Sequence, residues 1–195
     1  MADIRSPLPV KLFLGILTSI PSQLPEIEEK LIALLGPIDL KSDLFPFDQT
    51  NYYNEEMGNR PIYRQFSAFA RMIEPSEIAD IKVRTNELET EFAAQQPGIR
   101  RPVNLDPGYV EQSKVVLAST KNFFHRILVS KGIYAEVTLH YQAHRWQEFP
   151  WTFPDYKSDH YQRYFTSVRA FYRNQLSEAG FPIHKHRSGK SKIIL

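Results

Sequence analysis

The chain has 195 residues, of which 24 are Lys or Arg, 22 are Asp or Glu and none is Cys, so its formal net charge is +2. The absence of cysteine excludes a disulfide scaffold, thiol catalysis and any cysteine-ligated zinc or iron–sulfur site. The near balance of charge argues against a strongly basic nucleic-acid-binding protein. The longest apolar run, 12–17, is too short to span a bilayer, and no signal-peptide pattern accompanies it. We therefore expect one cytoplasmic domain over 1–195.

The first elements expected are a buried strand and an amphipathic helix. Segment 11–18 is short, apolar and bounded by prolines, as is typical of a buried strand. Apolar residues then recur at helical spacing over 27–35, and Gly36 followed by Pro37 indicates the end of this helix.

Two strands and a second helix follow. Strands are expected over 38–45 and 62–72, and Pro75 opens a helix whose apolar residues recur every three or four positions. A strand over 103–109 would complete the order βαββαβ, which is the ferredoxin-like unit.

The remaining chain predicts an extension of the sheet. Strands are expected over 114–119, 125–130 and 133–141, with Lys131–Gly132 as a tight hairpin turn. A two-residue turn there would pair Ser130 with Ile133, Ile127 with Glu136, and His125 with Thr138.

A last helix is expected over 159–176, with Ser158 as its N-cap and Gly180 as its stop, before a mobile basic tail at 184–195. The predicted fold class is α+β. A largely antiparallel sheet has a ferredoxin-like start and is extended by a C-terminal β-hairpin and helix.

Glu136 stands between apolar residues in a strand that should be buried. Because burying a carboxylate without a partner is costly, it should meet a cation or a ligand. The two-residue turn brings His125 to its face, whereas a shift of one residue brings Arg126 there instead. Either register leaves two interpretations, a structural ion pair or a working site.

The candidate catalytic group is Glu136 with Asp106 and His125, which could serve acid–base chemistry. His140 and His144 have i, i+4 spacing but lack the intervening Glu of a zinc-protease helix, so no metal site is assigned. The cofactor is left open.

Two aromatic loops stand out. The loop 45–61 is long and rich in aromatics and amides, so it is either functional or poorly ordered. The loop 149–156 contains two prolines and could pack as core or lid, or stack on a planar ligand. Candidate ligand-binding side chains come from these loops and from the strand faces between them. They are Asn104, Lys121, Arg126, Thr138, Asp48, Asn51, Tyr53, Asp155 and Tyr156.

Several blocks of the sequence resemble a prokaryotic family called domain of unknown function 4416. The blocks are PVKLFLGILTS (9–19), FPFDQTNYY (45–53), TNELE (85–89), VNLDPGY (103–109), VLASTK (116–121), HRI (125–127), GIYAEVTL (132–139) and PWTFPDYKS (150–158). The resemblance implies a cytoplasmic, single-domain protein and no known activity. Some members carry the label "GTP-binding protein", but Ser188–Ser191 lacks the first glycine, the preceding strand and the following helix of a phosphate-binding loop.

The leading hypothesis is a protein or enzyme that binds a phosphorylated or nucleotide-like small molecule in a mixed-charge pocket on the sheet. The alternative is a non-catalytic RNA-binding or scaffold module. Nucleic acid is not favoured, because Asp106 and Glu136 would repel phosphate. The sequence leaves the oligomeric state open.

Overall fold

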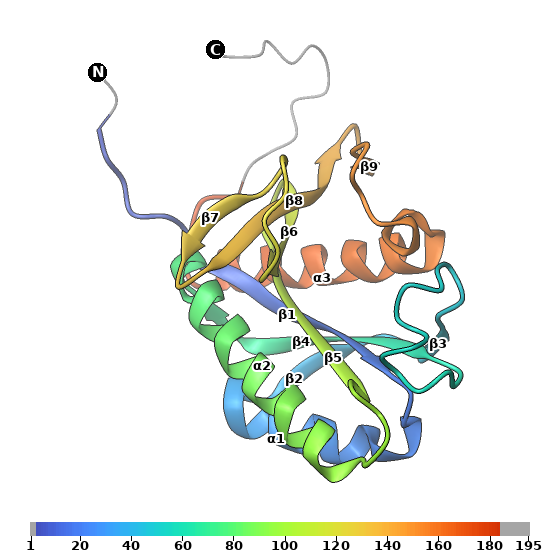
Figure 1. Ribbon diagram of the computed structural model, residues 1–195. Helices are drawn as coiled ribbons and strands as arrows, with labels where there is room; N and C mark the ends of the chain where they lie inside the picture. The colour runs from blue at the N-terminus through green and yellow to red at the C-terminus, as the bar shows by residue number, and fades with distance from the viewer. Residues whose placement is uncertain (1–2, 184–195) are drawn as a thin grey trace.

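The computed structural model describes residues 3–183, so the basic tail expected at 184–195 lies outside the described residues (Figure 1). Within them, three α-helices and a nine-stranded antiparallel sheet form an α+β fold, as the sequence predicts. The elements in chain order are β1 (Val10–Thr18), α1 (Leu24–Leu35), β2 (Ile38–Lys41), β3 (Phe45–Pro46), β4 (Tyr63–Ile73), α2 (Ile78–Gln95), β5 (Val103–Val110), β6 (Lys114–Ser119), β7 (Ile127–Ser130), β8 (Ile133–Gln142), β9 (Arg145–Glu148) and α3 (Asp159–Glu178).

The first half has the expected βαββαβ order. Its strands lie in the order β2-β4-β1-β5, with β1 antiparallel to both β4 and β5. All nine residues of β1 are buried because helices cover both of its faces. On one face, alternate β1 residues such as Leu12 and Leu14 pack against Ile27 and Leu31 of α1 and Phe92 of α2.

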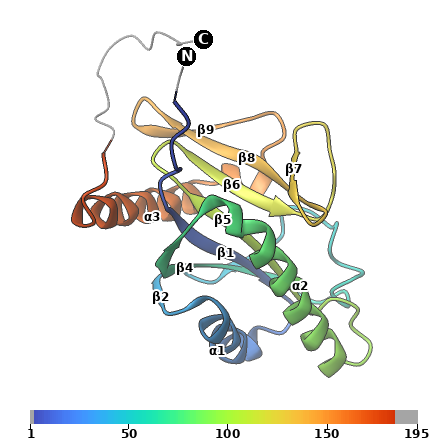
Figure 2. The same ribbon diagram turned by 90° about the vertical axis from the view of Figure 1, so that its left-hand side faces the viewer.

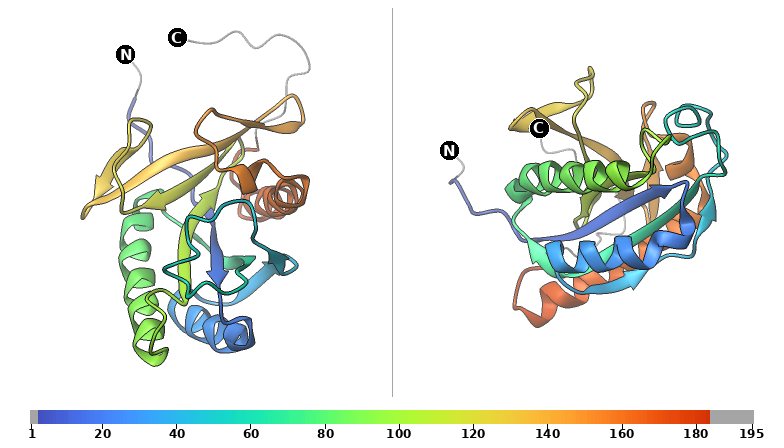
Figure 3. Two further views of the ribbon diagram at one scale, coloured as in Figure 1. Left: turned by 45° about the vertical axis from the view of Figure 1, so that its right-hand side comes forward. Right: turned by 60° about the horizontal axis from the view of Figure 1, so that its bottom comes forward.

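Helix α3 covers the opposite face of these strands (Figure 3). Phe13 of β1 and Phe66 of β4 pack there against Tyr161 and Phe165 of α3 in an aromatic cluster. Ser158 caps the helix through its side chain, as expected, accepting from the backbone N–H of Tyr161.

Strands β5 and β6 join the first half to an outer arm of the sheet formed by β6, β8, β7 and β9 (Figure 1). Their ladder pairs Gly108–Val110 with 115–117. Further along β5, α2 takes the place of a neighbouring strand. Leu105 donates its N–H to Glu89 at 2.8 Å, and its carbonyl accepts from Lys82 at 2.6 Å.

The register predicted for β7 is wrong beyond the turn. Lys131 and Gly132 have φ of 51° and 74°, as a tight hairpin turn requires, and Ser130 pairs with Ile133. An irregularity between Leu128 and Ser130 then moves Ile127 opposite Ala135 instead of Glu136. The strand also begins at Ile127, so the expected pairing of His125 with Thr138 is not formed.

Two further differences concern strand boundaries. The strand expected over 38–45 is broken into β2 and β3, which pair separately with β4. Strand β9 was not predicted at all. The turn before it places Ala143 and His144 at φ of 49° and 63°, a conformation that residues other than glycine rarely adopt. The glycine or asparagine that usually indicates such a turn is therefore missing from the sequence.

Candidate functional site

Glu136 on β8 is held by three side chains. Its side chain is 1% exposed, and Oε2 lies 3.0 Å from Nε2 of His125 and 2.8 Å from Nε of Arg126. Oε1 accepts from the Thr138 hydroxyl at 3.1 Å. The two basic residues that the sequence offered as alternatives therefore contact the same oxygen.

The imidazole of His125 is fixed on its edge and on its face. Glu136 holds Nε2, and the ring stacks on Trp151 with centroids 5.1 Å apart and planes 9° apart. Trp151 stacks in turn on Phe149 and donates its indole N–H to the carbonyl of Val137 at 3.0 Å. Because a carboxylate only accepts, Nε2 carries the hydrogen, and Nδ1 of the neutral ring is an acceptor.

Among residues 3–183 that acceptor has no hydrogen-bond partner, although the His125 side chain is 7% exposed. A buried polar atom without a partner is uncommon and calls for a physical explanation. His125 is thus an oriented imidazole whose second nitrogen, Nδ1, is buried and has no partner among the described residues.

Arg126 also anchors the turn that follows β6. Its Nη1 donates to the Ser119 hydroxyl and to the Lys121 carbonyl, both at 2.9 Å. The Lys121 side chain is exposed, and its ammonium group hydrogen-bonds the hydroxyl of Tyr52 from the loop between β3 and β4. Arg126 therefore sets the position of an exposed lysine near His125.

A second polar cluster surrounds Arg64 of β4, which is 4% exposed. Its guanidinium lies 3.4 Å from Asp155 and 3.5 Å from Asp106. Asn104 donates to Asp106 at 2.6 Å, and Lys82 lies 3.7 Å from the other oxygen of Asp106. Asp106 thus contacts Arg64, Asn104 and Lys82, whereas His125 belongs to the Glu136 cluster.

Burial determines the protonation chemistry of this second cluster. It raises the pKa of the Asp155 carboxyl, and the nearby Arg64 partly opposes that rise. Burial also raises the pKa of Tyr53, and the negative charge of Asp106 raises it further. Burial raises the pKa of Tyr156 well above its ordinary value. The two phenols therefore stay neutral.

The two clusters occupy one face of the sheet. Gly108 pairs with Leu117, and Leu117 pairs with Glu136, so alternation along β5 places Asp106 on the same face as Glu136. Adjacent tyrosines of the loop between β3 and β4 approach both clusters, with Tyr52 at Lys121 and Tyr53 near Asp106.

The remaining candidate residues lie apart from Glu136. Asp48 and Asn51 are exposed and hydrogen-bond their loop neighbours Gln49 and Asn54. Tyr156 is 2% exposed and packs on Phe66 and Phe165. That part of the 149–156 loop therefore contributes to the core, one of the two roles considered for it.

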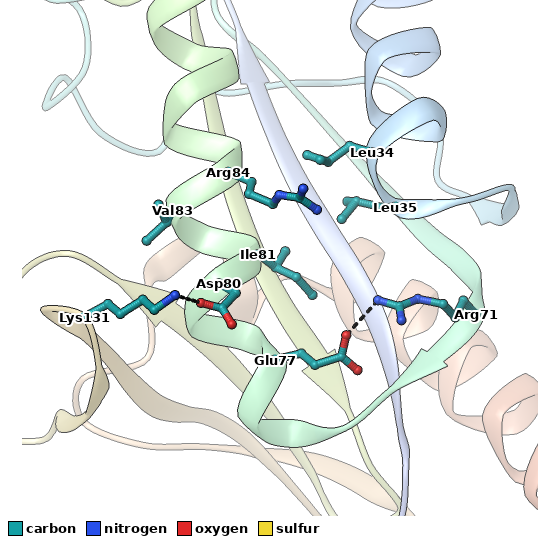
Figure 4. A pocket seen from close by; sticks show the side chains of 9 residues that line it. All are labelled: Leu34, Leu35, Arg71, Glu77, Asp80, Ile81, Val83, Arg84 and Lys131. Carbon is teal, nitrogen blue, oxygen red and sulfur yellow. Dashed lines mark hydrogen bonds and ion pairs between the residues drawn. The ribbon is translucent and has the colours of Figure 1, made fainter.

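Two pockets lie away from both clusters. One, of about 390 Å³, is bounded by α1, α2, β4 and the turn between β7 and β8 (Figure 4). Its rim carries the ion pairs Lys131–Asp80 and Arg71–Glu77. The other, of about 280 Å³, lies between the turn before β9 and the start of α3.

Sequence reasoning missed Arg64 and Trp151. Arg64 lies in a strand whose other residues are mostly uncharged. A strand of this kind is typically buried, so the sequence could have predicted that Arg64 needs an anionic partner. Trp151 was noted as part of an aromatic loop, but its stacking on His125 depends on two segments separated in the chain.

Among residues 3–183, no group of three or more His, Asp or Glu side chains is arranged to hold a metal ion. In the same part of the chain, no helix combines the length and the apolar composition needed to cross a membrane.

Comparison with curated proteins gives no match, and comparison with solved structures gives none either. The model of one protein family, described as "Domain of unknown function (DUF4416)", matches residues 8–172. This match covers both polar clusters and every strand and helix except the last residues of α3. The chain therefore belongs to the DUF4416 family.

Proposed function

We propose that the protein binds a phosphorylated or nucleotide-like small molecule beside His125, and that His125 exchanges a proton with it. The observation that carries the proposal is the oriented imidazole. Glu136 fixes one nitrogen, Trp151 supports the ring, and Nδ1 has no partner. Holding an imidazole at both edge and face is the arrangement that positions a general acid–base group.

The surface around His125 suits an anionic ligand with a planar part. Lys121 supplies an exposed ammonium group, which can contact a phosphate. Tyr52 and Phe124 are 62% and 80% exposed, so their rings are accessible for stacking. Asp106, with 26% of its side chain exposed, would orient ligand hydroxyl groups from the neighbouring cluster.

The chemistry follows from the tautomer. Neutral His125 would accept a proton at Nδ1 from the ligand or from a water molecule, and the carboxylate of Glu136 would stabilise the imidazolium that forms. The same ring could then return the proton to a leaving group. Arg126, which uses its Nε and Nη1 inside the protein, would position Glu136 and Lys121 instead of contacting the ligand.

Calorimetric titration of ATP and GTP, with and without Mg²⁺, tests this proposal. His125→Gln and Trp151→Leu should each weaken binding by about tenfold, the usual effect of losing a hydrogen bond to the ligand or a stacking partner. His160→Gln is the matched control, because His160 is exposed and contacts Arg163 and Phe45 instead. No binding by the wild type, or equal affinity in all variants, would contradict the proposal.

An RNA-binding function is the second candidate, favoured by the exposed Phe123 and Phe124 near Lys121. Ferredoxin-like RNA-binding modules stack bases on the open face of the sheet, but here α3 covers that face of β4, β1 and β5. Binding of single-stranded RNA across a salt series distinguishes the two functions, because phosphate contacts give a steep salt dependence.

A further inference from the structure

We propose that two copies of this chain form a symmetric dimer by pairing their β7 strands antiparallel, edge to edge. Strand β7 ends the sheet order β2-β4-β1-β5-β6-β8-β7, and its one partner within the described residues is β8 (Figure 2). Its outer edge therefore offers backbone N–H and C=O groups to another strand.

The side chains of this edge are apolar and uncovered. Ile127, Leu128 and Val129 are 76%, 57% and 40% exposed, and the preceding Phe123 and Phe124 are 57% and 80% exposed. Neighbouring strand residues point to opposite faces, so both faces of the edge are apolar. Edge strands are usually protected by proline, a charge, a bulge, short length or a covering element. β7 has four residues and one irregularity between Leu128 and Ser130, but it has no proline or charge between Ile127 and Ser130.

The exposed area is suitable for a dimer. Five such side chains present on the order of 500 Å² of apolar surface, at the upper end for a patch on a monomer. A stable interface buries roughly 800 Å² on each partner, and the flanks of these side chains together with the paired backbone edges would contribute to it. Pairing two edges would join the two sheets, and on each face the apolar side chains of β7 would contact their counterparts in the other copy.

Charge favours a second copy over an anionic partner. Segment 120–132 contains Lys121, Arg126 and Lys131 and no acidic residue. Arg126 is paired with Glu136, and Lys131 is paired with Asp80 on α2. With two of the three cations already neutralised, an anionic membrane or peptide meets little free positive charge, and two copies of the edge repel each other little.

Symmetry is also compatible with the edge. A two-fold axis near Leu128 would place Ile127 of each copy opposite Val129 of the other, and Arg126 opposite Ser130. Identical patches then face each other, and the interface closes without exposing a new edge of the same kind.

Disulfide crosslinking tests the geometry directly, because the chain contains no cysteine. Ile127→Cys, Leu128→Cys and Val129→Cys are each oxidised under mild conditions. Residues that face their own copy across a two-fold axis lie close enough for a disulfide, whereas their neighbours do not. We expect Leu128→Cys, which faces its own copy, to crosslink efficiently, and Ile32→Cys, on the exposed surface of α1, to stay uncrosslinked.

Sedimentation of the full chain tests the association itself. The wild type should be a dimer, and Ile127→Lys should raise the dimer dissociation constant at least about a hundredfold, since pairing would bury unpaired ammonium groups. Ile32→Lys is the control, and thermal unfolding checks that both variants are folded. A monomeric wild type at about 100 µM, a dimeric Ile127→Lys variant or the absence of β7 crosslinks would overturn the proposal. A monomer that binds anionic vesicles would assign the patch to membranes instead. Phe124 takes part in both proposals, but Ile127→Lys leaves Phe124 and His125 in place, so loss of the dimer and loss of nucleotide binding are measured separately.

Discussion

Arg126 and Glu136 are joined inside the protein by a 2.8 Å contact between Nε and Oε2, with side chains 11% and 1% exposed. A buried ion pair of this kind contributes little relative to a well-packed apolar replacement, but removing one partner leaves an uncompensated charge. The pair therefore makes the structure sensitive to any change at Glu136.

Glu136→Gln should accordingly lower the free energy of unfolding by about 3–5 kcal/mol, because Arg126 loses its anion. Urea unfolding measures this loss. Glu91→Gln is the control, since Glu91 pairs with Lys30 at the surface and its loss should cost less than about 1 kcal/mol. Equal small effects of the two substitutions would show that the Glu136 cluster is not held as described.

Because of this expected loss of stability, a substitution at Glu136 cannot distinguish a structural role of the cluster from a functional one. Glu136→Gln should destabilise the protein whether or not a ligand binds, so lost activity in that variant would be ambiguous. His125 is the better position, because Gln can keep a hydrogen bond to Glu136 while it removes the Nδ1 acceptor.

Arg64→Met should destabilise the protein in a pH-dependent way. Arg64 lies between Asp155 and Asp106, so its removal leaves two carboxylates without their guanidinium and should cost about 3–5 kcal/mol near pH 7. Burial already raises the pKa of Asp155 above its ordinary 3.8, and Arg64 opposes that rise. Without Arg64 the pKa should rise further.

The direction of this pH dependence follows from proton linkage. A carboxyl whose pKa is raised in the folded state binds more protons there than when unfolded, so stability falls as the pH rises from 3.8 toward the folded pKa. The deficit of Arg64→Met should therefore be smaller near pH 4.5 than near pH 7. Urea unfolding at both pH values measures it, with the exposed Arg71→Met as control. A deficit independent of pH would contradict the role given to Asp155.

How far the sequence predicts this structure depends on the range of the interactions. β1, α1, α2 and α3 were predicted because their apolar spacing and caps are local signals. The register of β7 was not, since the irregularity between Leu128 and Ser130 has no pattern of its own. A cation beside Glu136 was predictable because a buried carboxylate needs one. The pairing of Arg64 with Asp155 was not, because 91 positions separate them and only the tertiary fold joins them.

At the edge of β5, two side chains of α2 make the backbone hydrogen bonds that a neighbouring strand would otherwise make. Lys82 and Glu89 satisfy the carbonyl and the N–H of Leu105. Lys82→Met combined with Glu89→Leu removes both charges of the pair, and it also takes one partner from Asp106 and one from Arg101. We expect a loss of about 2–5 kcal/mol from these groups and the two unpaired backbone groups together, and the Leu105 amide reports on the backbone alone. Hydrogen exchange should show a deprotected Leu105 amide, and unchanged protection would contradict this role of α2.

Gly108 lies where the two parts of the sheet join, opposite Leu117 in the short ladder between β5 and β6. A Cβ there would come within 3.0 Å of the Val116 carbonyl and of the Phe13 ring. A backbone carbonyl in a ladder cannot move aside, and the Phe13 ring is enclosed by the aromatic cluster under α3.

Gly108→Ala should therefore lower the free energy of unfolding by at least about 3 kcal/mol, the upper end of the range for overpacked cores. Gly98→Ala is the matched control. No atom lies within 4 Å of its added Cβ, so only its φ of +89° opposes the substitution, at a cost of about 1–2 kcal/mol. Urea unfolding of the two variants ranks them. If Gly98→Ala proved the more damaging, backbone conformation and not close packing at the junction of β5 and β6 would limit the stability of the sheet.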